Sequence, residues 1–199
     1  MNSFLETLET RELVVPISRT FYHEAAAAGL LDRDVELLRG IILKKMPKSP
    51  YHILLVRRLY SLLTSALEEA TLSERYFVSK EDPIAIGDSE PEPDLAIIAG
   101  NPEHYSSALP HSAELVIEVA VHTLERDRLK AAIYAEAGVS EYWIVDAGSK
   151  RIERHSLAHQ ETATYLQRSF FEVGNTLSST WMPSLKVDLS VLFSDEGTS

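Results

Sequence analysis

The sequence predicts a single α/β domain in which a mixed central β-sheet is flanked by helices and carries additional β-hairpins. Short apolar segments of strand length alternate with longer segments of helical periodicity, and turn residues separate them. The chain has 199 residues, of which 45% are hydrophobic, and this suits one sizeable core. Two domains of this total length would both be small, so we expect one domain over residues 1–199.

The first expected helix is capped by Ser18 and ended by Gly29. Two extended pieces that turn at Gly40 are predicted by the next segment, VELLRGIILKKM. Ser49 and Pro50 then suit the start of a helix of about 18 residues. Its apolar positions follow helical spacing, and they are Ile53, Val56, Leu59, Tyr60, Leu63 and Leu67. We expect this helix to be central to the core.

A series of short strands and one further long helix should follow. The strands are expected at about 75–79, 84–86, 95–99 and 114–121. The helix runs from about Glu125 to Ala137, with Gly138 in a C-terminal capping role. EYWIVD at 141–146 is typical of a fully buried strand, and AGSK turns it into a hairpin partner at 151–156. We expect more strands after this hairpin and a docked tail at 185–193.

Composition excludes several classes of protein. No segment approaches the roughly 18 consecutive apolar residues of a membrane helix. The N-terminus carries acids where a secretory signal would carry a basic patch and an apolar run. Because there is no cysteine, disulfides, cysteine-based zinc sites and a thiol nucleophile are excluded. We therefore expect a cytoplasmic protein.

The net charge of −11 argues against a nonspecific grip on nucleic acid, which depends on neutralising phosphates. Charge is unevenly distributed, however, because no acidic residue occurs from Leu37 to Leu67. The basic residues of this segment are Arg39, Lys44, Lys45, Lys48, Arg57 and Arg58. The segment is either a nucleic-acid contact or a solvated face that balances acids elsewhere.

Glu118 is the most informative position for chemistry. It lies in ELVIEVAV (114–121), a strand that is apolar on both faces and so expected to be buried on both. A carboxylate there needs a cation, hydrogen-bond donors or a solvent-filled cleft, because an unpaired charge costs several kcal/mol to bury. The alternative is a glutamate at the exposed end of the strand or bonded to an arginine.

Asp94 opens the preceding strand in EPEPDLAII, where the proline before it is typical of a loop exit. Alone this motif is weak. If the two strands are adjacent, Asp94 and Glu118 can together offer oxygen ligands to one hard divalent cation such as Mg²⁺.

Lys130 is the third candidate. Asp127, Lys130 and Tyr134 are spaced i, i+3 and i+7 and therefore share one helix face. Ala120 points to the same side of its strand as Glu118, and its small side chain leaves room for a lysine. The alternative is a surface ion pair between Asp127 and Lys130. His52, at the start of the first long helix, is expected to serve packing, although a hydrogen-bonding or phosphate-contact role is also open.

These residues resemble the PD-(D/E)XK nucleases, whose motif is an acid after proline followed by Glu-x-Lys on the next strand. The chain is more closely similar to the Uma-two family of putative restriction endonucleases. The matching segments span nearly the whole chain in order, and they are VELLRGIILKKM, KSPYH, EPEPDLAII, ELVIEVAV, DRLKAAIYAEAGVSEYWIVD and PSLKVDLSVLF. The resemblance implies a restriction-endonuclease-like core.

Carried over residue by residue, the resemblance makes Asp94 and Glu118 the acids of the motif. The lysine's own place is taken by Ala120, and in this family the lysine is taken to have moved to the following helix, here Lys130. Relatives often read Gly-Glu-Ile where this chain has Gly40-Ile41-Ile42, so one carboxylate is missing, and Glu36 or Glu92 could replace it.

The expected function is metal-dependent cleavage of DNA. Asp94, Glu118 and the carbonyl of Val119 would hold Mg²⁺ or Mn²⁺, Lys130 would act on the substrate or the attacking water, and Asp127 and Tyr134 would support them. By analogy with restriction enzymes we expect a homodimer. Two alternatives stay open: a degenerate nuclease fold that binds or assembles, and a nuclease acting on RNA or on an unusual nucleic acid structure.

Overall fold

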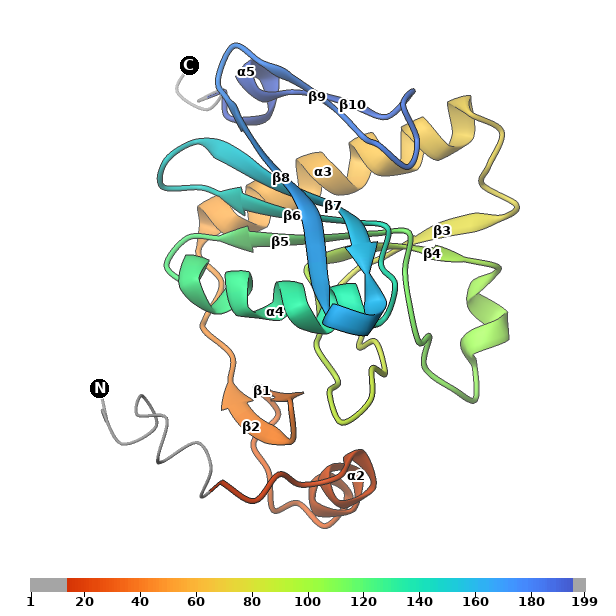
Figure 1. Cartoon of the computed structure of the whole chain (residues 1–199), viewed down its shortest axis with the longest axis vertical. Helices are drawn as coiled ribbons and strands as arrows, with labels where there is room; N and C mark the ends of the chain where they lie inside the picture. The colour runs from red at the N-terminus through yellow and green to blue at the C-terminus, as the bar shows by residue number, and fades with distance from the viewer. Residues whose placement is uncertain (1–13, 195–199) are drawn as a thin grey trace.

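The computed structural model describes residues 14–194 and places a six-stranded sheet between two helical layers (Figure 1). The strands, in their order across the sheet, are β3 (Tyr76–Ser79), β4 (Leu95–Ala99), β5 (Leu115–Ala120), β6 (Glu141–Asp146), β7 (Arg151–His159) and β8 (Thr164–Glu172). β5 and β6 are parallel and the other neighbours are antiparallel. The predicted mixed sheet flanked by helices is confirmed.

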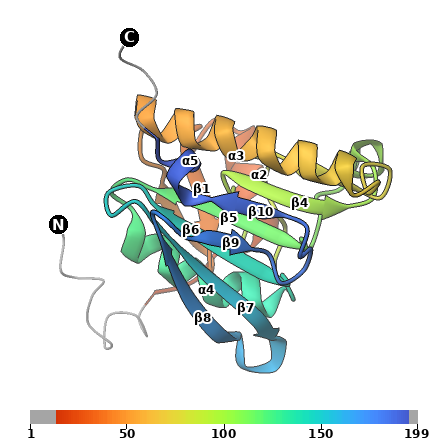
Figure 2. The ribbon, with the colours of Figure 1, turned by 90° about the horizontal axis from the view of Figure 1, so that it is seen from above.

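The two long helices lie on opposite faces of this sheet (Figures 1 and 2). α3 (Pro50–Glu69) begins where the sequence indicated, because the Ser49 side chain accepts a hydrogen bond from the His52 N–H. α4 (Leu124–Glu136) forms the crossover that two parallel strands require, and it joins β5 to β6. Gly138 follows α4 with a φ of 71°, a left-handed conformation typical of the residue after a helix.

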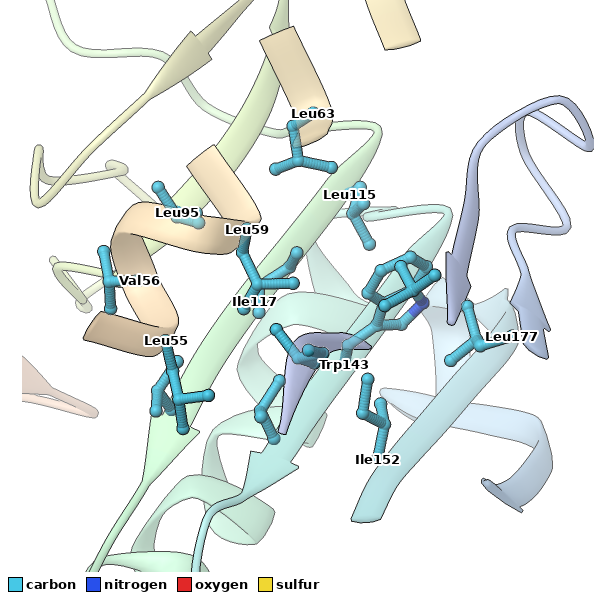
Figure 3. Close-up of a cluster of buried hydrophobic side chains, with 14 of the residues drawn as sticks. Leu55, Val56, Leu59, Leu63, Leu95, Leu115, Ile117, Trp143, Ile152 and Leu177 are labelled. Carbon is cyan, nitrogen blue, oxygen red and sulfur yellow. The ribbon is translucent and has the colours of Figure 1, made fainter. Parts of the chain in front are cut away.

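Each helix covers its own hydrophobic core. α3 packs on the face of the sheet that carries Leu95, Ile117 and Trp143 (Figure 3). α4 packs on the other face, which carries Val116, Tyr142 and Ile144. Because β5 contributes to both cores, it is buried along its whole length, as its sequence indicated.

The predicted apolar face of α3 needs a correction. Val56, Leu59, Leu63 and Leu67 are buried, but Ile53 is 37% exposed and Tyr60 is 40% exposed. The helix is rotated so that its buried face also contains His52 and Leu55. This rotation brings a polar residue of the first helical turn against the sheet.

The N-terminal part forms a small layer of its own beside the sheet. α2 (Arg19–Ala27) is capped by Ser18 as expected, and it leads to the hairpin of β1 (Val35–Leu38) and β2 (Ile41–Lys44). Gly40 is required at the turn, because its φ is 72° and a Cβ there would lie 2.4 Å from the Pro16 Cβ. The hairpin joins the rest of the fold through the Glu90 N–H, which donates to the Leu37 carbonyl over 2.6 Å.

The C-terminal tail docks on the α3 side, as predicted. β9 (Thr176–Ser178) pairs with β10 (Lys186–Asp188), and α5 (Leu189–Leu192) follows. The part of the chain that the structure describes also contains short 3₁₀ helices at Pro102–Tyr105 and Gln160–Thr162. The strand expected at 84–86 is wrong: Ile84 is buried, but this segment forms only one isolated bridge, between Ile86 and Ser89. Within residues 14–194, no helix is long and apolar enough to cross a membrane.

Candidate functional site

Asp94 and Glu118 meet because their strands are neighbours. β4 and β5 pair antiparallel with Leu95 opposite Ile117, so Asp94 and Glu118 lie one position further along, at the end of this ladder. Asp94 is 7% exposed and Glu118 is 5% exposed. The adjacency that the sequence analysis assumed for the two strands is therefore present.

Lys130 and Tyr134 reach Glu118 from α4. The Lys130 Nζ lies 2.9 Å from Glu118 Oε1, and the Tyr134 hydroxyl donates to the same oxygen over 3.0 Å. Lys130 is only 3% exposed, so the interpretation of this lysine as half of a surface ion pair is wrong. The helix face predicted from the i, i+3, i+7 spacing is turned toward the sheet.

Asp127 and Val119 lie in the same region with different contacts. Asp127 is buried and accepts a hydrogen bond of 2.5 Å from the Thr123 hydroxyl at the start of α4. The Val119 N–H donates to Asp94 Oδ2 over 2.8 Å, which ties the two strands together at the site. The role of the Val119 carbonyl as a metal ligand stays a prediction.

A third carboxylate comes from β1. Glu36 is 1% exposed, and its Oε2 lies 3.0 Å from the Lys130 Nζ, which thus bridges Glu36 and Glu118. Ile41 does not line this cleft. Glu92 lines it nearer the mouth, where Lys45 donates to its carboxylate over 2.6 Å. Of the two suggested replacements for the missing acid, Glu36 is the one in contact with the lysine.

His52 is a site residue that the sequence analysis assigned to packing. Its Nε2 lies 3.0 Å from Asp94 Oδ2, and the pair is buried. The rotation of α3 described above is what carries this ring to Asp94. Its helical spacing with Leu55, Leu59 and Leu63 could have indicated burial, but no sequence signal indicated Asp94 as the partner.

The pKa values of Asp94 and Glu118 are shifted in opposite directions. Burial acts to raise the pKa of Asp94, but the hydrogen bond and charge of His52, the Val119 N–H and Lys48 outweigh it and hold that pKa below its usual value. Burial raises the pKa of Glu118 to about 8; Lys130 opposes the rise, and the charges of Asp127, Asp94 and Glu36 add to it. Asp94 is therefore the more acidic of the two carboxyl groups, and the Lys130 ammonium is the charge that favours ionisation of Glu118.

These residues line a cleft of about 560 Å³ that opens between the β1–β2 hairpin and the sheet. Basic residues surround the acids, and those in the cleft are Lys44, Lys45, Lys48, Arg126 and Lys130. Arg126 was missed by the sequence analysis, and it joins α4 to β2 by donating to the Lys44 carbonyl over 3.1 Å. Lys48 lies 3.5 Å from Asp94 Oδ1 and 3.0 Å from Glu81 Oε2.

The basic segment does not form one continuous face. Lys44, Lys45 and Lys48 line the cleft, whereas Arg39 pairs with Glu136 outside it. Arg58 donates to the carbonyls of Leu192 and Ser194 over 2.8 Å and so holds the C-terminal tail. Arg57 is exposed on α3 and does not line the cleft. A contact of all six residues with nucleic acid stays a prediction.

The donor set fits a hard divalent cation. Within the described range 14–194, no three His, Cys, Asp or Glu side chains are gathered as ready metal ligands, and the Lys130 ammonium lies between Glu36 and Glu118. The oxygens at hand are nevertheless carboxylates, the type that Mg²⁺ prefers. Glu36 Oε2 is buried and accepts no hydrogen bond from the described residues, and the cation it now faces is the Lys130 ammonium at 3.0 Å.

The fold and this arrangement of buried acids and lysine define a protein of the restriction-endonuclease-like class. Residues 27–191 match the Uma2 (Uma-two) family, which is described as "Putative restriction endonuclease", and the chain belongs to that family. A comparison with curated proteins found no match.

Two solved structures illustrate the likeness. One is a putative nuclease from Anabaena variabilis ATCC 29413, with a TM-score of 0.66 and 14% identity over 80% of this chain and 89% of that one. The other is the type IIG restriction endonuclease BpuSI, with a TM-score of 0.42 and 18% identity over 72% of this chain and 16% of that one. At these identities, the first structure supports the fold.

Proposed function

We propose that this protein is a metal-dependent endonuclease that hydrolyses phosphodiester bonds in DNA. The observation that carries the proposal is the buried meeting of Asp94, Glu118 and Lys130 at the base of a cleft with further lysines along its walls. Buried ionisable groups with strongly shifted pKa values, gathered in a cleft, are typical of active sites. Family membership supports the proposed reaction class, and this constellation supports the proposed residues.

Asp94, Glu118 and the Val119 carbonyl would hold Mg²⁺ or Mn²⁺, with Glu36 close enough to assist. The metal would supply Lewis-acid activation of the scissile phosphate and of the attacking water. Lys130 would place a positive charge beside the phosphate, and Tyr134 and Asp127 would fix the positions of Glu118 and of the helix start. Lys44, Lys45 and Lys48 would contact the flanking phosphates.

A second candidate is a degenerate nuclease fold that binds nucleic acid without cutting it. The net charge of −11 and the isoleucine at position 41 favour this reading. The buried Glu36 weakens it, because a third carboxylate is present at the site. We expect a homodimer, since cutting both strands of a duplex is served by paired sites, and sedimentation of the purified chain measures this.

The test of the proposed function is cleavage of supercoiled plasmid, single-stranded DNA and RNA with Mg²⁺ or Mn²⁺. Wild-type protein should cut DNA only with added metal, and Asp94→Ala should abolish the cut. DNA binding without cleavage under every condition would favour the degenerate fold. Faster cutting of RNA than of DNA would show that RNA is the preferred substrate of this site.

A further inference from the structure

The two oxygens of Asp94 have different surroundings. Oδ2 receives two donors, the Val119 N–H at 2.8 Å and His52 Nε2 at 3.0 Å. Oδ1 faces the Lys48 ammonium at 3.5 Å, on the side of the cleft. A free carboxylate can rotate about its terminal bond, because that torsion is broad, and two donors on one oxygen restrict this rotation.

His52 contributes one of those donors from a fixed position. An ionised carboxylate only accepts hydrogen bonds, so Nε2 must carry the proton in this contact. The backbone of His52 is held in the first turn of α3, where its N–H donates to the Ser49 hydroxyl over 3.2 Å. The His52 side chain is 10% exposed, which leaves the ring little freedom to turn away.

The rest of the ring has no competing contact. The other nitrogen, Nδ1, is buried and has no hydrogen-bond partner among the described residues. A histidine kept only for packing would leave two polar nitrogens buried at a cost of about 1–3 kcal/mol each. Within residues 14–194, the one hydrogen bond that the ring makes is the one to Asp94.

We propose that His52 is a positioning residue that holds Asp94 so that Oδ1 is the oxygen presented to the divalent cation. This inference rests on the proposed function, because it assigns a role within the same site. His52 touches neither substrate nor metal in this account. It acts through Asp94, as donors to metal-binding carboxylates commonly do, and loss of such a partner typically weakens metal binding about 10–100-fold.

The experiment compares His52→Leu with His52→Gln, whose side-chain amide offers a donor where Nε2 lies. Mn²⁺ affinity is measured by calorimetry, DNA affinity by anisotropy in Ca²⁺, and turnover by plasmid cleavage. His159→Leu is the matched control, because that histidine is on β7 and bonds Thr162. All titrations are made well below the melting temperature of each variant, so that a loss of fold is not read as a loss of metal.

His52→Leu should weaken Mn²⁺ binding by about 10–100-fold and lower kcat, with DNA affinity and KM nearly unchanged. His52→Gln should recover most of the lost Mn²⁺ affinity and most of the lost kcat, and His159→Leu should match wild type. Wild-type Mn²⁺ affinity in folded His52→Leu would overturn the role of His52 and leave the proposed function standing. Equal losses of Mn²⁺ affinity in His52→Leu and His52→Gln would also overturn the positioning role of His52. A wild-type protein that binds no Mn²⁺ would overturn both proposals.

Discussion

Lys130 is the residue on which the electrostatics of the site depend. Its ammonium lies within 3.0 Å of carboxylate oxygens from both Glu118 and Glu36, and the residue is only 3% exposed. Burial alone would lower the pKa of Lys130, but the charges of Glu118, Glu36 and Asp127 outweigh it and raise that pKa above its ordinary value. The lysine therefore stays charged, and it is a fixed cation at the base of the cleft.

Replacing Lys130 by alanine should lower the cleavage rate by about two to three orders of magnitude, the scale of one preorganised electrostatic group. Metal affinity should fall little or rise, because a positive charge beside the metal site is removed. Lys130→Arg should rescue activity only in part, since a planar guanidinium does not replace a compact ammonium. Cleavage rates and Mn²⁺ titrations check this, and full activity in Lys130→Ala would remove the lysine from the mechanism.

Elements whose patterns are local were predictable from the sequence. The caps at Ser18 and Ser49, the turn at Gly40 and the buried strand β5 are confirmed because each depends on neighbouring residues. The 84–86 segment was not predictable as a loop, because its burial comes from tertiary packing rather than from a sheet ladder.

Charge reversal in β2 and the loop after it should show whether the basic segment contacts nucleic acid or is only a solvated face. Replacing Lys44 and Lys45 by glutamate should weaken DNA binding equally for all sequences and reduce the salt slope by about one unit per lost phosphate contact. Reversal of Arg75 and Lys186, which lie outside the cleft lining, is the matched control. An unchanged salt slope in the Lys44/Lys45 variant would show that these lysines form only a solvated face.

β7 carries a histidine that should make stability depend on pH. Burial lowers the pKa of His155 to about 4, helped by the charge of Arg168 and opposed by Glu153. Since the unfolded chain binds this proton near pH 6.5, the contribution of neutral His155 is complete above pH 6.5 and is lost as pH falls toward 4. We expect it to be on the order of 2 kcal/mol.

Urea unfolding of wild type and His155→Gln between pH 4 and 7.5 measures this contribution. The slope of unfolding free energy against pH between 4 and 6.5 should be smaller in the variant, which has no imidazole to protonate. Parallel curves for the two proteins would show that His155 titrates normally in the folded state.

For the whole molecule, the site is assembled from five elements that are separate in the sequence. Asp94 and Glu118 enter on neighbouring strands, Lys130 on α4, Glu36 on the β1–β2 hairpin and His52 on α3. The spacing of 94, 118 and 130 was readable because an acid in an apolar strand and a helix face are local signals. Glu36 was only one of two suggested replacement acids and His52 was assigned to packing, because their contacts depend on how separate elements pack.

The proposed mechanism requires Asp94 and Glu118 to bind one divalent cation together. Calorimetric titration with Mn²⁺ at neutral pH measures this binding in wild type, Asp94→Asn and Glu118→Gln. We expect one site per chain in wild type and loss of that site in both variants, each of which removes one carboxylate charge while keeping the shape of the side chain. Wild-type affinity in either folded variant would contradict the claim and place the metal elsewhere.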